Sequence, residues 1–230
     1  MVYYFLKDDI NSKIIGSDFP QAYKFTKEYQ KKSGDANGIY SFFKKIQQNE
    51  RPDFDPDLGG FILSGRAKLT NIVSTTMPRL HMDNEAKEVF SSCNLGDSEF
   101  YNAQLYIKQR KIFTQILDYN YFCSFTNILD YICFPETIFR HEISIPRNLI
   151  EYITGLSSIS AYSEYRNQNR EGIIFPETIT MKEGFDKTLD YFIIRELNVH
   201  HGIASERLKT AIEENGITGL RFEPIEIIFK

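Results

Sequence analysis

The chain has 230 residues and a formal net charge of −4, with charged residues at 25% and apolar residues at 42%. These proportions predict a globular protein of one large or two small domains, and they exclude intrinsic disorder and fibrous repeats. The acidic balance argues against a nucleic-acid-binding protein and favours a basic partner. The 19 phenylalanines and 14 tyrosines, with no tryptophan, favour β-sheet.

The first elements are predicted to be a strand and a helix. Val2–Leu6 is an apolar run that fits an opening strand. Phe19–Lys32 places aromatic residues among lysines and fits either a helix or irregular structure. Gly38–Gln48 is predicted to be a short helix, because four apolar residues recur at helical spacing: Ile39, Phe42, Phe43 and Ile46.

A loop, two strands and a second helix are predicted next. Two prolines and a Gly-Gly pair indicate a loop over Asn49–Gly60. Strand-like runs follow at Phe61–Leu63 and Lys68–Thr76. Over Asp83–Ser92 the pattern predicts a helix with Asp83 as its N-cap and an apolar face made of Ala86, Val89 and Phe90.

The middle of the chain is dense in tyrosine, phenylalanine and isoleucine. Several strands joined by short turns are predicted there: Ser98–Lys108, Lys111–Tyr119 and a third run within Tyr121–Phe139. Asn148–Ile153 is predicted to be a short helix. The polar stretch Ser157–Gly172 is predicted to be a mobile loop.

The C-terminal part is predicted to contain strands around one well-defined helix. The strand-like runs are Glu177–Lys182, Asp190–Leu197, Val199–Ala204 and, after the helix, Gly219–Phe229. Ser205 caps the helix over Ser205–Asn215, and Gly216 supplies a left-handed stop. The whole pattern predicts an α+β fold, with a mostly antiparallel sheet, a few short helices and the C-terminal helix packed on the sheet.

Domain organisation is predicted from composition. A smaller α+β half over residues 1–95 and a larger α+β domain over residues 96–230 fit the change in composition, and one continuous domain fits as well. The sequence Phe-Pro-Glu-Thr-Ile occurs at both Phe134–Ile138 and Phe175–Ile179, which predicts that two strands begin in a similar way.

The targeting and cysteine patterns bear on localisation. The apolar run at the N-terminus is too short for a signal peptide, and no stretch approaches the ~20 apolar residues of a membrane span, so we expect a cytoplasmic protein without a membrane partner. Cys93, Cys123 and Cys133 have an odd count and no C-x-x-C spacing. We therefore expect no disulfide framework and no zinc site, and interpret all three as core residues.

One acidic pattern, Asp53, Asp55 and Asp57, could bind either calcium or a partner protein. An EF-hand loop needs glycine at its sixth position and glutamate at its twelfth. Leu58 and Ser64 stand at those positions. The calcium-binding regulatory module is therefore kept only as an alternative. A solvated acidic loop is the better interpretation of this cluster, which as an exposed anionic group could also contact a basic partner.

Catalytic motifs are weak throughout the chain. The four histidines, His81, His141, His200 and His201, form no H-E-x-x-H pattern, and the serines form no G-x-S-x-G elbow. A small enzyme pairing Cys123 or Cys133 with a distant histidine is a second alternative, because such pairs need only spatial proximity. No metal ligand set and no cofactor is expected.

The segment Ala204–Ile225 carries the most specific pattern in the chain. A capped helix is followed by two glycines and a strand that ends in Phe-x-Pro. This segment resembles the C-terminal signature of immunity protein family eleven of bacterial polymorphic toxin systems. The matching residues are Ser205, Leu208, Lys209, Ala211, Gly216, Ile217, Gly219, Leu220, Phe222 and Pro224.

Two further features resemble the family: the opening Tyr3-Tyr4 pair and the run Asn127–Asp130. Cys133 and the Phe-Pro after it depart from the family pattern, so a closely related immunity family is also consistent with the sequence. The resemblance implies a non-enzymatic inhibitor that binds a cognate toxin domain made by the same cell and neutralises it. The matched residues are expected to specify the fold, while toxin contacts would lie on variable surface.

Overall fold

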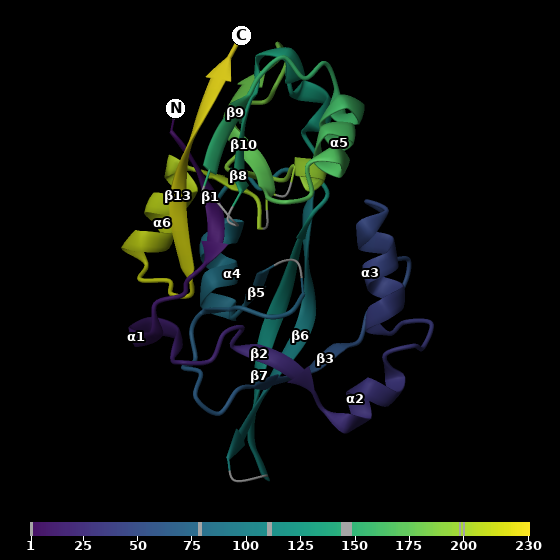
Figure 1. The fold of residues 1–230 in the computed structure, drawn as a ribbon. Helices are drawn as coiled ribbons and strands as arrows, with labels where there is room; N and C mark the ends of the chain where they lie inside the picture. Colours follow the sequence, from purple (N-terminus) through teal and green to yellow (C-terminus); the bar gives the residue numbers. More distant parts are fainter. Residues whose placement is uncertain (1, 78–79, 110–111, 144–148, 198, 200) are drawn as a thin grey trace.

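The computed structural model describes residues 2–77, 80–109, 112–143, 149–197, 199 and 201–230. Within them the chain forms an α+β fold, as predicted, with thirteen strands in two mostly antiparallel sheets and six α-helices (Figure 1). His200 lies outside the described residues, as does Asn148 of the predicted helix.

The six-stranded sheet is built around a long hairpin. Its strand order is β2-β3-β6-β7-β5-β4, and its bounds are β2 Ala22–Phe25, β3 Leu58–Leu63, β4 Ile72–Val73, β5 Leu80–Met82, β6 Ser98–Gln109 and β7 Ile112–Ser124. β6 and β7 pair along nearly their whole length, whereas β5 pairs only with the end of β7. The hairpin therefore projects beyond its neighbours, toward the lower end of Figure 1.

The seven-stranded sheet brings both ends of the chain together. Its order is β11-β12-β1-β13-β10-β8-β9, with β1 Tyr3–Asp8, β8 Ile138–Ile143, β9 Leu149–Ile153, β10 Ile173–Met181, β11 Tyr191–Phe192, β12 Ile203–Ser205 and β13 Leu220–Phe229. β1 lies between β12 and β13 and is antiparallel to both. β10 and β13 are parallel.

The helices cover the sheets in separate groups. Their bounds are α1 Ser12–Ile15, α2 Lys27–Lys32, α3 Ile39–Gln47, α4 Asn84–Ser91, α5 Ile159–Gln168 and α6 Glu206–Glu214, and three short 3₁₀ helices span Leu129–Tyr131, Phe134–Glu136 and Arg195–Leu197. α2 and α3 bury apolar side chains against the six-stranded sheet. α4 and α6 contribute to a cluster that contains residues of both sheets, so this cluster joins the two halves of the core.

Phe122 of β7 lies at the centre of this joining cluster. Its ring centroid lies 5.6 Å from that of Phe90 on α4, 4.9 Å from that of Phe100 on β6 and 5.1 Å from that of Tyr191 on β11. Phe122 is fully buried. One side chain therefore contacts both sheets and a helix.

Several secondary-structure predictions are wrong, and part of Phe19–Lys32, expected to be helical or irregular, forms strand β2. Leu149–Ile153 is a strand, β9, rather than a helix, because it pairs with β8 along its whole length. The stretch predicted to be a mobile loop contains helix α5, which Ser158 caps by accepting a hydrogen bond from the backbone N–H of Ala161. A single buried residue, Tyr162, anchors this polar helix, so the sequence shows little helical periodicity.

Other boundaries differ where the chain turns. The strand predicted over 68–76 is reduced to the two residues of β4, and the run predicted over 190–197 begins as strand β11 and continues into a 3₁₀ helix. The first Phe-Pro-Glu-Thr-Ile copy begins with a 3₁₀ helix and only the second lies in a strand, so the predicted similarity between the two copies is wrong. The division at residue 95 stays a prediction, and the six-stranded sheet includes strands from both sides of it.

Candidate binding site

The serine and leucine of the matched motif, Ser205 and Leu208, fix the start of α6. The Ser205 hydroxyl accepts a hydrogen bond from the backbone N–H of Leu208, whose side chain is fully buried. The same hydroxyl donates to the buried carboxylate of Asp190, at 2.6 Å. Although burial raises the pKa of Asp190, hydrogen bonds from Arg207, Ser205 and the backbone N–H of Asn94 outweigh it and lower that pKa below its ordinary value.

The remaining motif residues form the turn and strand after α6. Gly216 and Gly219 both have positive φ, of 66° and 104°. Leu220, Phe222 and Pro224 lie in β13 opposite β1, and the Phe222 ring packs edge-on against Tyr4 at 6.1 Å. These residues therefore lie in the turn and the strand that follow α6, and their structural role stays a prediction.

The three aspartates of the acidic pattern are exposed in the loop before β3. The Asp57 carboxylate accepts a hydrogen bond from the backbone N–H of Gly59 at 3.1 Å, and its backbone carbonyl accepts one from the Tyr29 hydroxyl. Within the described part of the chain, no group of three or more His, Cys, Asp or Glu side chains is placed to hold a metal ion. Partner contact through Asp53, Asp55 and Asp57 stays a prediction.

The described histidines have partners other than cysteine. His81 Nδ1 lies 3.2 Å from the Thr75 hydroxyl, His201 Nε2 lies 3.0 Å from Asp8, and His141 packs edge-on to Tyr165. Cys123 is buried in the core, as predicted. The prediction is wrong for Cys133, which is half-buried beside Lys230 at the surface, and Cys93 is only partly buried.

His81 is the most strongly shifted of these groups. It is sandwiched between Phe61 and Tyr121, each with a ring centroid 4.6 Å away. Burial, with a smaller contribution from His201, lowers the pKa of His81 from 6.5 to about 3. The ring is therefore neutral at physiological pH, which suits packing rather than proton transfer.

This shift predicts a pH dependence of stability. Because the unfolded chain takes up a proton at His81 below about pH 6.5 and the folded chain does not until about pH 3, stability is lost as the pH falls through this window. In His81→Phe this loss is expected to disappear, reducing the pH slope by up to about 1.4 kcal/mol per pH unit. Urea unfolding of the unmodified protein and of His81→Phe at pH 7, 5.5 and 4 measures how the free energy of unfolding depends on pH. Equal pH slopes would show that the buried His81 ring does not cause this dependence.

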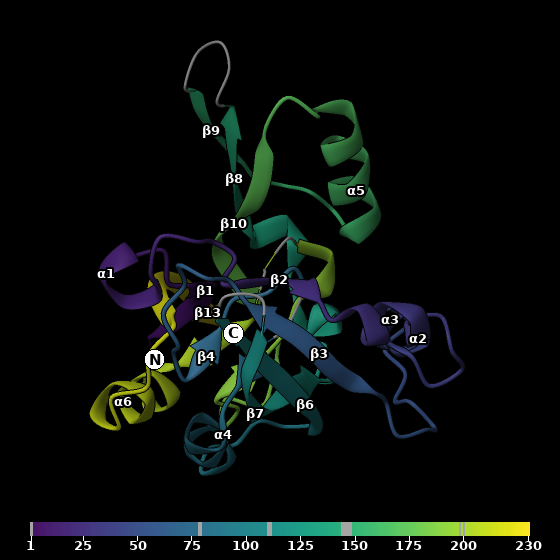
Figure 2. The same cartoon turned by 90° about the horizontal axis from the view of Figure 1, so that it is seen from below.

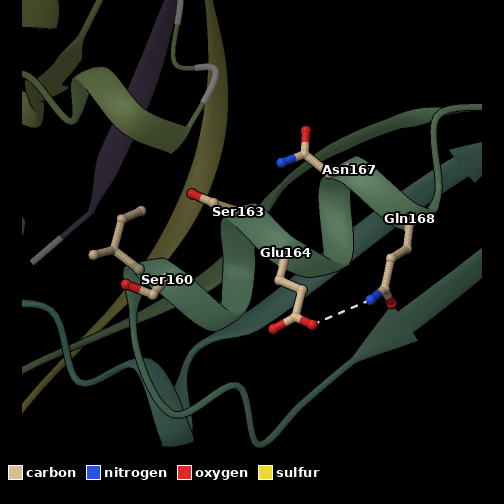
Figure 3. Close-up of a pocket in the computed structure, with 6 residues that line it drawn as sticks. Ser160, Ser163, Glu164, Asn167 and Gln168 are labelled. Carbon is tan, nitrogen blue, oxygen red and sulfur yellow. Dashed lines mark hydrogen bonds between the residues drawn. The ribbon is translucent and has the colours of Figure 1, made fainter.

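An open hollow lies over the outer face of α5. Figure 3 shows its polar lining, with Ser160, Ser163, Glu164, Asn167 and Gln168 along the helix and a hydrogen bond of 3.2 Å between Glu164 and Gln168. All of its lining residues come from this one helix. A ligand there would stay largely hydrated, so this hollow is a weak candidate for a binding site.

The stronger candidate is a cleft within the seven-stranded sheet. Its volume is about 340 Å³. Residues of four strands and one loop line it: Phe5, Leu6 and Lys7 of β1, Arg140 and Glu142 of β8, Ile173 and Phe175 of β10, Glu223 of β13, and Val199. We refer to it as the sheet cleft. Apolar walls with a few charged groups are the usual composition of a binding site.

The sheet cleft exists because two neighbouring strands separate. In the described residues, β10 and β13 pair only over Thr178–Met181 and Glu226–Phe229. Before these positions, β10 pairs with β8 on its far side, and β13 pairs with β1 on its far side. A second hollow of about 620 Å³ continues the cleft past Glu177 and Glu226.

Arg140 is the central charged residue of the cleft. Its guanidinium lies 3.2 Å from Glu142 and 3.1 Å from Glu177, and 4.4 Å from the centroid of the Phe175 ring. Across the cleft, Lys7 pairs with Glu223 at 2.5 Å. Both bases are therefore already engaged, and the guanidinium is held against an aromatic surface.

An exposed apolar face adjoins the cleft. On β9, Ile150 and Tyr152 are 52% and 63% exposed, and Ile173 at the start of β10 is 61% exposed. The register places Ile150, Glu142 and Ile173 in one row across three strands, and the next row contains Tyr152, Arg140 and Phe175. Residues directly opposite in antiparallel strands share a face, so these six side chains form one surface, the arm face.

The opposite face of the same strands is covered. Phe139 packs against Tyr162 of α5 with ring centroids 5.0 Å apart. In Figure 2, α5 and the ends of β8 and β9 project from the rest of the molecule. The arm face is thus the open side of a projecting layer whose other side is packed.

A scan against models of known protein families finds no match to this chain, and a search of curated proteins finds none either. No helix in the described ranges is long and apolar enough to cross a membrane. The arm face and the sheet cleft were not predicted from the sequence. Arg140 and Glu142, two residues apart within the run Ile138–Ile143, were the available signal for a strand with one exposed face.

Proposed function

We propose that the protein is an immunity protein, which binds a toxin domain made by the same cell and inhibits it by stoichiometric contact rather than by a reaction. The sequence resemblance over Ala204–Ile225 is the first support. The folded segment agrees with it, since Ser205 caps the helix, Gly219 makes the turn and Phe222 packs on the opening strand. Because the matched residues act within the fold, they do not restrict which residues stand on the surface, and the surface can differ according to the toxin that is bound.

The arm face is the observation that carries this proposal. Exposed apolar side chains side by side around a charged centre are typical of protein interfaces, in which aromatic and arginine residues supply most of the binding energy. Tyr152 and Arg140 lie opposite each other in this surface. A stable complex must bury ~1,200–2,000 Å² in total, so the arm face would form the centre of a larger contact.

Co-expression tests this function directly. An immunity gene is expected to lie directly downstream of a large modular toxin gene, so the chain is produced in bacteria together with the C-terminal domain of that neighbouring toxin. We expect growth to be restored and the two proteins to co-purify as a complex. Persistent toxicity without a complex would refute the proposal for this pair.

A matched pair of substitutions locates the contact. Tyr152→Ala is expected to weaken the complex at least tenfold, as ~2 kcal/mol is typical of a central interface tyrosine. Tyr40→Ala is the control, since Tyr40 on α3 is 67% exposed and lies outside the arm face. Its effect is expected to stay below about twofold. Equal effects of the two changes on the dissociation constant would place the contact elsewhere.

A further inference from the structure

The carboxylates in and beside the sheet cleft outnumber its bases. Glu142, Glu177, Glu223 and Glu226 line the cleft and its continuation, whereas Lys7 and Arg140 are the only bases among the described residues that line them. Three of these carboxylates are bound to the two bases, and the fourth, Glu226, accepts a hydrogen bond from Thr178 at 3.0 Å. An excess of two negative charges therefore lies in a half-buried site, where charge interactions are stronger than on open surface.

The two strands that border the cleft, β10 and β13, separate from each other along its length. Among the described residues, the first half of β10 has ladder partners in β8 and the first half of β13 has ladder partners in β1. The space between two separated strands suits an extended peptide segment. The cleft thus combines two separated strands, an apolar wall and an acidic excess.

We infer that the sheet cleft binds an extended segment of the partner protein that carries an arginine or lysine between apolar residues. This inference rests on the proposed function and adds the chemistry of the partner. The cationic group pairs with Glu177 and Glu223, and the apolar neighbours pack on Ile173 and Phe175. A salt-bridge partner of this kind would also steer association by charge.

Other occupants fit the site less well. An anionic segment would meet an excess of carboxylates while both bases of the cleft are already paired. A second copy of this chain that presented β9 would bring Glu151 and no base, because Leu149–Ile153 contains no lysine or arginine. The charge of the cleft therefore selects a basic segment of another protein.

Short peptides test the inference without the toxin. The probes are acetyl-Ile-Arg-Ile-amide and the same peptide with citrulline, which keeps the shape of arginine and removes its charge. Binding to the full chain is followed by amide chemical shifts in low-salt buffer. We expect the arginine peptide to bind at least fivefold more tightly, with shifts centred on Ile173 and Phe175. Equal binding of the two peptides, no binding of either, or shifts elsewhere would overturn the inference.

Substitutions of the cleft carboxylates test whether they cause the preference for arginine. Combining Glu177→Gln with Glu223→Gln is expected to reduce arginine-peptide binding to the citrulline level. Glu164→Gln, on the exposed face of α5, is the matched control and should leave binding unchanged. If the double variant still prefers arginine, the acidic excess is not the cause and the inference fails.

The experiments can refute the immunity function and the basic-segment site independently of each other. Arginine-selective binding in the cleft without protection in co-expression would reject the immunity function and keep the basic-segment site. Protection and a stable complex that are insensitive to the double glutamate variant and to added salt would keep the function and reject the site.

Discussion

Replacing Phe122 with alanine is expected to lower the free energy of unfolding by about 4 kcal/mol. The side chain is fully buried and its ring contacts Phe90, Phe100 and Tyr191, which lie on α4, β6 and β11. Because these elements belong to both sheets and a helix, the cavity cannot be closed by a shift of one of them. Urea unfolding followed by circular dichroism measures the change.

Two comparisons control for a general effect of losing an aromatic residue. Phe122→Leu keeps most of the volume and is expected to lower the unfolding free energy by about 1.5 kcal/mol. Phe113 lies on the same strand near the projecting end of the hairpin, and its side chain is 45% exposed. Phe113→Ala is therefore expected to change the free energy of unfolding by less than about 1 kcal/mol. Similar losses for Phe113 and Phe122 would show that Phe122 does not join the sheets.

Replacing Gly219 with alanine is expected to destabilise the protein by about 3 kcal/mol or more, or to prevent soluble expression. A Cβ at this position would lie 1.8 Å from the backbone carbonyl oxygen of Ile72, and φ is already +104°. The surrounding turn is fixed, because Asn71 bonds Thr218 and the backbone N–H of Asp9 donates to the Gly219 carbonyl. Neither backbone segment can move without breaking these bonds.

Gly216 provides the matched control within the same motif. Its φ is +66°, but nothing lies within 4 Å of an added Cβ. Gly216→Ala should therefore lower the unfolding free energy by only about 1 kcal/mol, the strain of a left-handed alanine. Thermal and urea unfolding of both variants separate the two cases, and equal effects would contradict the close approach at Ile72.

The elements predicted correctly are those with local signals. Helices α3, α4 and α6 begin where the sequence predicts, and Asp83 and Ser205 cap the last two through their side chains. A cap and an apolar face lie within one short window, so neighbouring residues determine them. The α+β class followed from the same local patterns.

The elements and the site that were missed depend on distant residues. β9 is a strand because β8 pairs with it, and α5 is held by Tyr162 against Phe139. The sheet cleft needs Lys7 and Glu223, which are 216 residues apart, and Arg140 beside Phe175. No window of sequence contains these pairs, so composition and periodicity could not predict the cleft or the arm face.

The central position of β1 bears on how the protein is made. β1 is synthesised well before both of its partners, β12 and β13, since Tyr3 pairs with Ser205 and Ile225. At roughly 5–20 residues per second, the ribosome needs about 11 to 45 seconds to reach Ile225 after Tyr3. During that time the strands of the six-stranded sheet, residues 22–124, are already complete. The wall of the cleft formed by β1 and β13 can therefore assemble only after β13 has been synthesised, and the cleft is incomplete on any shorter nascent chain.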